Sequence, residues 1–142
     1  MGVAYSFLRM LFTDNPVRDE EDRNILLHVN FNDAQSLTFV LNNCENIHDF
    51  YTAQGNTFEI RVVTHGLGLH LLREDTSPVK ERLQGMVADM PSLSFYACTN
   101  TQDRMEKAEG KRPELIPEAI MVRAGIPEII ELQRAGWTYI KP

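Results

Sequence analysis

Short apolar runs alternate along this chain with longer segments in which apolar residues recur every three or four positions. The runs contain no Gly or Pro, as is typical of strands, and cover residues 24–31, 57–64, 93–97, 119–122 and 137–140. The segments between most of them have the periodicity of helices that bury one side. Strands that alternate with helices form a parallel sheet with right-handed crossovers. The sequence therefore predicts an α/β protein with a flavodoxin-like, five-stranded, mostly parallel sheet and helices on both faces.

The first expected helix shows a start, a buried face and an end. Asn32 and Gln35 have the spacing of a capping box, and Gly55 can end the helix. Its apolar positions form one stripe, which comprises Leu37, Val40, Leu41, Cys44, Ile47 and Tyr51. A cysteine on the buried face of a helix packs as a small hydrophobic residue. Cys44 is therefore expected to be structural.

Two later helices carry similar signals. Ser77-Pro78 is expected to be an N-cap followed by proline at the first helical position. The last helix should begin at 124–127, with Ile126, Ile129 and Ile130 facing inward and Gly136 ending it.

Composition limits the class of protein. The chain has 142 residues, of which 43% are apolar, and this is enough for one domain with its own core. Lys and Arg number 14 against 20 Asp and Glu, so the net charge of -6 argues against a nucleic-acid partner or a polybasic membrane patch. No apolar run has the length of a membrane span. Two cysteines are too few for a disulfide framework, which favours a cytoplasmic protein.

The first residues differ in character from the rest. Residues 1–23 combine an apolar segment with an acidic linker, and residues 24–142 form the expected domain. The apolar stretch Gly2–Phe12 has no basic leader, and Arg9 interrupts it, so it does not match a secretory signal. We expect it to pack on the domain or on a neighbouring subunit.

Cys98 follows the strand 93–97 and comes just before a second capping-box pair, Thr99 and Gln102. The carboxyl edge of a parallel sheet is where ligands bind, and a helix amino terminus favours thiolate over thiol. Cys98 is therefore a candidate reactive cysteine. The alternative is a buried cysteine that fills the junction between strand and helix. Asn100 can offer its amide to a small anion, or serve only as a turn residue.

The segment His65-Gly66-Leu67-Gly68-Leu69-His70 follows the second strand. Its histidines lack the spacing of a helical zinc pair, and its glycines lack the rest of a phosphate-binding fingerprint, so no metal and no cofactor is predicted. Gly66 and Gly68 are expected to meet a need for positive φ or close approach. The loop should wall the pocket beside Cys98, with His65 as a neighbour. His28 is expected to be a hydrogen-bonded core or rim histidine.

Several pieces together match a known pattern: the opening strand with its helix through Asn46, the loop 66–68, the stretch 95–101 and the closing segment 124–142. Through them the chain from about Asn24 to Pro142 resembles the DsrE/DsrF-like family of small sulfur-relay proteins. Members of that family associate into dimers, trimers or hexamers. Some pass persulfide sulfur through a cysteine at the end of the third strand, which is followed by a helix carrying Arg. Cys98 and Arg104 fall at those positions.

The resemblance implies an oligomeric, cytoplasmic sulfur carrier. Cys98 and Arg104 would be its catalytic residues, and sulfur donor and acceptor proteins its partners. The residues that would line its binding site are His65, Gly66, Gly68 and Asn100. The alternative is a non-catalytic oligomeric domain that binds a small metabolite, with Cys98 only packed. A third possibility is a component that works only within a larger complex.

Overall fold

The structure is a computed structural model that describes residues 23–142. The expected packing of the apolar stretch Gly2–Phe12 lies outside the described residues. The strands are β1 (Arg23–Val29), β2 (Phe58–Thr64), β3 (Leu93–Cys98), β4 (Ala119–Val122) and β5 (Thr138–Ile140). The helices are α2 (Ala34–Ala53), α3 (Lys80–Asp89), α4 (Thr99–Glu109), α5 (Gly125–Arg134) and the 3-10 helix η1 (Gly66–Leu72). All five expected strands are present, with ends that differ by up to two residues.

The sheet has the strand order β4-β3-β2-β1-β5, and every pairing is parallel. The predicted α/β, flavodoxin-like class is confirmed, although flavodoxin itself has a different strand order. β1 to β4 follow one another across the sheet, whereas β5 lies on the opposite side of β1. The winding direction thus reverses between β1 and β5. In open parallel sheets, ligands bind at the carboxyl ends of the strands at such a reversal.

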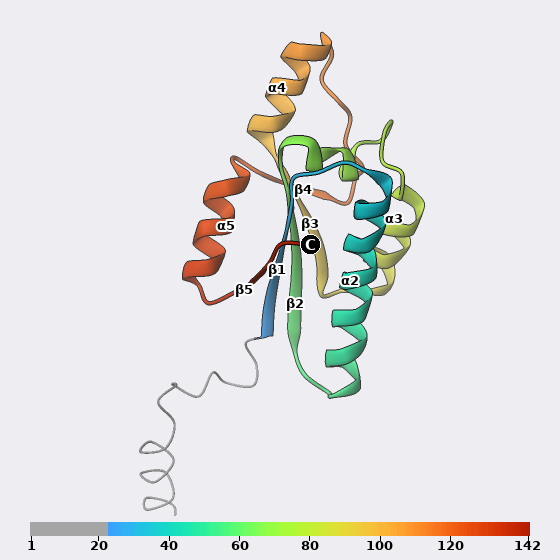
Figure 1. The fold of residues 1–142 in the computed structure, drawn as a ribbon, viewed down its shortest axis with the longest axis vertical. Helices are drawn as coiled ribbons and strands as arrows, with labels where there is room; N and C mark the ends of the chain where they lie inside the picture. Colours follow the sequence, from blue (N-terminus) through green and yellow to red (C-terminus); the bar gives the residue numbers. More distant parts are fainter. Residues whose placement is uncertain (1–22) are drawn as a thin grey trace, which may run out of the picture.

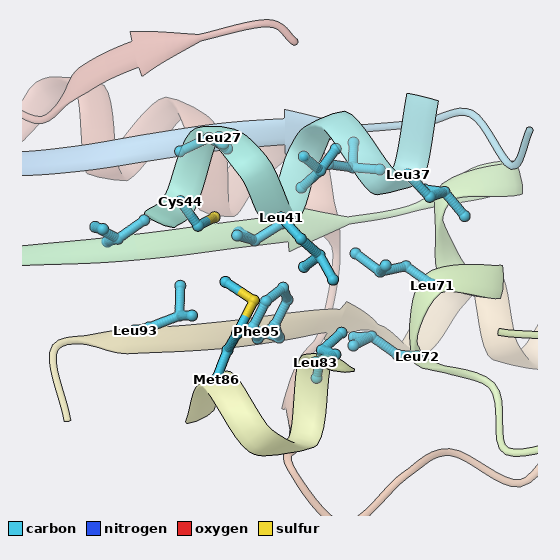
Figure 2. Close-up of a cluster of buried hydrophobic side chains, with 14 of the residues drawn as sticks. Leu27, Leu37, Leu41, Cys44, Leu71, Leu72, Leu83, Met86, Leu93 and Phe95 are labelled. Atoms are coloured by element: carbon cyan, nitrogen blue, oxygen red, sulfur yellow. The ribbon is translucent and has the colours of Figure 1, made fainter. Parts of the chain in front are cut away.

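Helices cover both faces of the sheet, with α2 and α3 on one side and α5 on the other (Figure 1). The main core lies under α2 and α3, where Leu41 and Met86 pack against Leu27 and Phe95 of the sheet (Figure 2). Full burial of each such side chain contributes about 1.5–3 kcal/mol. The opposite face carries a smaller cluster, formed by Leu26, Val63, Ile129 and Leu132.

Cys44 lies in the main core, fully buried between α2 and the sheet (Figure 2). Burial raises the pKa of its thiol to about 12, so it stays protonated and unreactive at neutral pH. The predicted structural role of Cys44 is confirmed. Gly55, with φ of 69°, follows the end of α2 as expected.

Two helices begin at residues other than those predicted. α2 is capped by Asp33 instead of Asn32, because the chain stays extended through Asp33 and its carboxylate accepts from the Ser36 N–H at 2.9 Å. α3 begins at Lys80 without a side-chain cap. Ser77 does not cap it, because Val79 occupies the N-cap position; the Ser77 N–H instead closes a turn onto the carbonyl of Arg73 at 3.1 Å.

The buried face of α5 also differs from the prediction. Ile129 is buried together with Leu132, but Ile126 and Ile130 are 47% and 45% exposed. The helix covers its face of the sheet alone, so one narrow stripe is buried and the residues beside it remain exposed. The expectation that Ile126 and Ile130 face inward was wrong. Gly136, with φ of 93°, lies just beyond the helix as expected.

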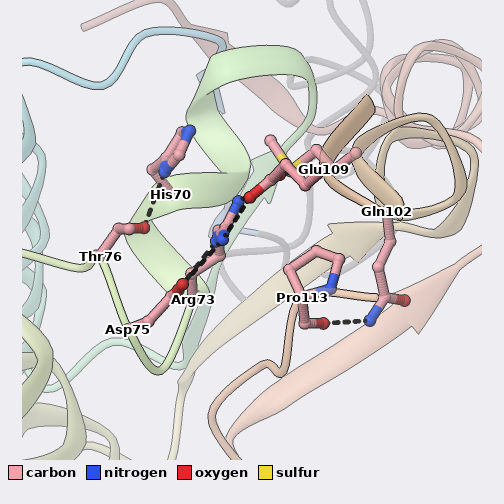
Figure 3. Close-up of polar contacts among 8 residues, drawn as sticks. His70, Arg73, Asp75, Thr76, Gln102, Glu109 and Pro113 are labelled. Atoms are coloured by element: carbon pink, nitrogen blue, oxygen red, sulfur yellow. Dashed lines mark hydrogen bonds and ion pairs between the residues drawn. The ribbon is translucent and has the colours of Figure 1, made fainter. Parts of the chain in front are cut away.

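α4 extends above the carboxyl edge of the sheet, next to η1 (Figure 1). β3 runs into it without a loop, so Cys98 is the N-cap and Thr99 is the first helical residue. The predicted capping box of Thr99 and Gln102 was therefore wrong. The Gln102 side chain instead donates to the carbonyl of Pro113 at 2.9 Å, which attaches α4 to the following segment (Figure 3).

Candidate functional site

The two glycines after β2 dock η1 onto the carboxyl edge of the sheet. Gly66 has φ of 55°, and its N–H donates to the Thr101 hydroxyl of α4 at 3.0 Å. A β-carbon added to Gly68 would lie 2.1 Å from the carbonyl oxygen of Val29, at the end of β1. Positive φ and close approach, the two reasons expected for these glycines, therefore both occur. The loop was expected to wall a pocket beside Cys98; it contacts the start of α4 through Thr101, but the cavity that it walls is not lined by Cys98.

A cavity of about 490 Å³ lies between η1 and α4. Its lining comprises His65, Gly66, Leu67, His70, Thr101, Arg104, Met105, Ala108 and Glu109. Three of the predicted site residues, His65, Gly66 and Arg104, are thus brought together. Gly68 and Asn100 do not line it: Gly68 of η1 packs against the backbone of Val29, and the Asn100 N–H donates to the carbonyl of Arg123 at 3.2 Å.

Cys98 ends β3, opposite Val122 of β4. Its sulfur accepts a hydrogen bond from the Thr101 N–H at 3.4 Å. An amide donor at a helix amino terminus stabilises negative charge on sulfur. The residue is only 5% exposed in the single chain. Cys98 does not line the cavity itself, but Thr101 both lines the cavity and contacts the sulfur.

A chain of three side chains that the sequence did not reveal lies where the winding reverses. His28 Nδ1 is 2.7 Å from the Tyr139 hydroxyl, and His28 Nε2 is 2.6 Å from His65 Nε2. The β1–β5 register pairs Leu26 with Tyr139, which puts Tyr139 on the sheet face that carries His28. One signal was available in the sequence: His28 and His65 each lie near the carboxyl end of one of two neighbouring strands.

Both histidines are neutral at pH 7. Burial lowers the pKa of His28 to about 4, with further contributions from His65 and Lys141. Burial and Lys141 also lower the pKa of His65. Lys141 is held over the ring of Phe31, and its ammonium donates to the Asn30 side chain at 2.6 Å. A fixed positive charge therefore lies near the pair and opposes its protonation.

The Nε2 atoms of His28 and His65 lie closer together than two ligands of one zinc ion would. Two nitrogens on one tetrahedral zinc ion, each about 2.0–2.1 Å from the metal, would be separated by about 3.3 Å. The observed separation of the two Nε2 atoms is 2.6 Å. Within residues 23–142, no group of three or more His, Cys, Asp or Glu side chains is arranged to hold a metal ion.

A second cluster attaches α4 to the segment after η1 (Figure 3). Arg73 is 4% exposed and forms paired hydrogen bonds with Asp75 and Glu109 at 2.8–2.9 Å. The guanidinium lowers the pKa of both carboxyl groups, and they raise its own pKa. A smaller cavity of about 260 Å³ adjoins this cluster. Arg73 thus fixes the far end of α4, next to the larger cavity.

The fold and the site define a small parallel α/β protein with a largely apolar cavity at the carboxyl edge of its sheet, flanked by a helix-capping cysteine and a histidine pair. No family model matches the chain, and no curated protein matches it. Among solved structures, it is similar to a protein of unknown function, MTH1491, from Methanobacterium thermoautotrophicum. The two share 25% identity with a TM-score of 0.70, over 85% of this chain and 100% of that one. Among the helices of residues 23–142, none is both long and apolar enough to span a membrane.

Proposed function

We propose that the protein is a cytoplasmic, homo-oligomeric sulfur carrier that uses Cys98, as its resemblance to the DsrE/DsrF-like family implies. The observation that carries the proposal is the Thr101 N–H, which donates to the Cys98 sulfur at the amino terminus of α4. Sulfur transfer requires the thiolate, which is the nucleophilic form of cysteine. The partners would be a protein that donates sulfane sulfur and a protein that accepts it.

The transfer has a simple balance. The Cys98 thiolate attacks the terminal sulfur of a donor persulfide, the donor's S–S bond breaks, and the donor leaves as a thiolate. Cys98 then carries the persulfide, and an acceptor thiolate attacks its outer sulfur and releases the Cys98 thiolate. Arg104 lines the adjoining cavity and would supply positive charge to the anionic persulfide.

Cys98 must become accessible for this reaction, because it is 5% exposed in the single chain. Its sulfur accepts from the Thr101 N–H in the first turn of α4, and the Thr101 hydroxyl in turn accepts from the Gly66 N–H of η1. A docking partner would displace this turn. Association into dimers, trimers or hexamers is consistent with the exposed Ile126 and Ile130 of α5.

Mass spectrometry tests the proposal directly. The protein is incubated with a low-molecular-weight persulfide, and the intact mass is measured. We expect an adduct of about 32 Da, one sulfur atom, on the wild type and on Cys44→Ala but not on Cys98→Ser. The Cys44→Ala variant is the matched control, because Cys44 is buried in the main core. An adduct that persists in Cys98→Ser, or none on the wild type, contradicts the proposal.

A second function is favoured by the burial of Cys98 and by the cavity of about 490 Å³ beside it. In this alternative the protein is a non-catalytic oligomeric domain that binds a small metabolite in that cavity, and Cys98 is a packing residue. It predicts that Cys98 in the native protein resists alkylation by iodoacetamide. It also predicts that Cys98→Ala leaves the biological function intact.

A further inference from the structure

The histidine pair connects the exposed edge strand β5 with the cavity between η1 and α4, and the proposed sulfur transfer does not use this connection. Tyr139 is 38% exposed at the edge strand β5, and His65 lines the cavity between η1 and α4. His28 lies between them and forms a hydrogen bond with each through a different ring nitrogen. A continuous hydrogen-bonded chain therefore runs from an exposed phenol to the cavity wall.

In the hydrogen-bonded series Tyr139–His28–His65, the position of one proton determines the positions of the other protons. A single proton lies between the two Nε2 atoms, because both rings are neutral. If the phenol donates to His28 Nδ1, the proton of His28 is on Nε2 and is donated to His65. The proton of His65 must then be on Nδ1. In the opposite arrangement, His65 Nε2 donates to His28 and His28 Nδ1 donates to the phenol oxygen, so His65 Nδ1 carries no proton.

The first of these two arrangements is the more stable. A phenol is a stronger acid than a neutral imidazole N–H and is therefore the better donor of the pair. On this ground Tyr139 is expected to donate to His28, and His28 to His65, in the resting state. Within the part of the chain that the structure describes, His65 Nδ1 has no hydrogen-bonding partner, so its N–H is free to donate to a bound molecule.

We propose that Tyr139, His28 and His65 form a proton relay that makes the cavity a site for a small anion, which receives a proton from His65. Arg104 is the cation in the lining that would pair with the anion. The other charged group of the lining, Glu109, is already paired with Arg73. His70 is tied to the Thr76 hydroxyl at 2.7 Å, and burial lowers its pKa.

The proton transfer needs no reagent besides solvent water. His65 gives its Nδ1 proton to the bound anion and takes the Nε2 proton of His28. His28 then takes the phenolic proton at Nδ1, and Tyr139 regains a proton from a water molecule, which leaves as hydroxide. No ring becomes charged, which suits a site where burial and Lys141 disfavour imidazolium. The substrate class is thus a small anion that takes up a proton as it reacts.

Nitrogen NMR of the full chain, labelled with ¹⁵N-histidine, tests the relay at neutral pH. We expect neutral rings, with the His28 proton on Nε2 and the His65 proton on Nδ1. Tyr139→Phe should turn the single tautomer of each ring into a mixture. The matched control, Tyr51→Phe, removes a hydroxyl from α2 and should change neither ring. A His65 proton resident on Nε2, a charged ring, or tautomers unchanged by Tyr139→Phe would overturn the relay.

Titration with inorganic phosphate tests the anion site. Saturable shifts of the His65 nitrogens are expected, with about fivefold weaker binding in Tyr139→Phe or Arg104→Gln, the loss of about one hydrogen bond. Circular dichroism checks that each variant is folded. An absence of saturable shifts in the folded wild type contradicts the anion site. Cys98→Ser should leave the tautomers and the titration unchanged, so failure of this inference and failure of the sulfur-carrier proposal are distinguishable, although both use Arg104.

Discussion

Gly125, the first residue of α5, lies directly against the side chain of His65. A β-carbon added to Gly125 would be 2.9 Å from His65 Cβ and 3.3 Å from Cγ and Cδ2. The residue does not have a positive φ, so close approach is what requires glycine here. The contact holds the His65 ring in place while its Nε2 is bonded to His28.

Gly125→Ala should therefore displace His65. The added methyl group requires the imidazole to shift by several tenths of an ångström, which lengthens the short His28–His65 hydrogen bond. We expect altered ¹⁵N shifts of both rings and a loss of about 1–2 kcal/mol in the free energy of unfolding. Gly85→Ala is the control, because nothing lies within 4 Å of its position in α3. That substitution should stabilise the protein by about 0.5–1 kcal/mol and leave the rings unchanged.

Gly68→Ala is expected to be more damaging. Its β-carbon would lie 2.1 Å from the Val29 carbonyl oxygen and 2.6 Å from the carbonyl carbon. Backbone atoms of a central strand cannot move away as a side chain can, so η1 must lift off β1. We expect a loss of about 3 kcal/mol or more in urea unfolding. Gly66→Ala meets nothing within 4 Å and has only the cost of its positive φ, about 1 kcal/mol. Equal losses in the two variants would contradict this account.

The neutral histidine pair should make stability depend on pH. The pKa of His28 is about 4 in the folded chain, below the ordinary value of 6.5, so the unfolded chain binds more protons between these values. The stabilising contribution is complete above pH 6.5 and is lost as the pH falls toward 4. We expect a loss of about 1 kcal/mol at pH 5 relative to pH 7, after allowance for solvent screening. His28→Gln, measured by urea unfolding at both values, should show a smaller loss. If His28→Gln loses as much stability between pH 7 and pH 5 as the wild type, the pH dependence comes from other titratable groups.

The fold was predictable because it depends on patterns that are local in the sequence. The five apolar runs and the helical periodicity between them specify a parallel α/β sheet whatever the details of the ends. The caps were less predictable. Asp33 and Asn32 are both good capping residues, and the choice between them depends on where the chain leaves its extended conformation.

The candidate site was predictable only in part. Cys98, Arg104 and His65 follow strands, so their place at the carboxyl edge could be inferred from the sequence. The hydrogen bond between His28 and Tyr139 joins residues 111 positions apart and requires β5 to pair with β1. The order of strands is a tertiary property that no local pattern records. The burial of Cys98 was unpredictable for the same reason, because it depends on which elements pack around the end of β3.

Self-association through α5 is a further expectation. Ile126 and Ile130 are exposed, and Ile120 of the edge strand β4 is 44% exposed. Register with Tyr96 puts Ile120 on the sheet face that α5 covers. Sedimentation velocity at micromolar concentration should detect an oligomer that Ile126→Glu dissociates. Phe50→Glu, on α2 across the sheet, is the control and should leave the oligomer intact. A monomeric wild type contradicts the expectation.

The Arg73 cluster should control how firmly α4 is held beside the cavity (Figure 3). Glu109 is in the last turn of α4, and its carboxylate pairs with Arg73, which lies after η1. Glu109→Gln removes the charge of this pair, so amide hydrogen exchange in the last turns of α4 should become faster. Glu106→Gln is the control, because Glu106 pairs with the partly exposed Arg112 instead.

Arg73 lowers the pKa of Glu109, so the ion pair stabilises α4 above the ordinary carboxyl pKa, and this stabilisation is lost as the pH falls below that value. The expected signature is a protection factor, the exchange rate corrected for the intrinsic rate at the same pH, that falls at low pH in the wild type but not in Glu109→Gln. Equal protection factors in the wild type and Glu109→Gln at neutral pH would show that the pair does not hold α4.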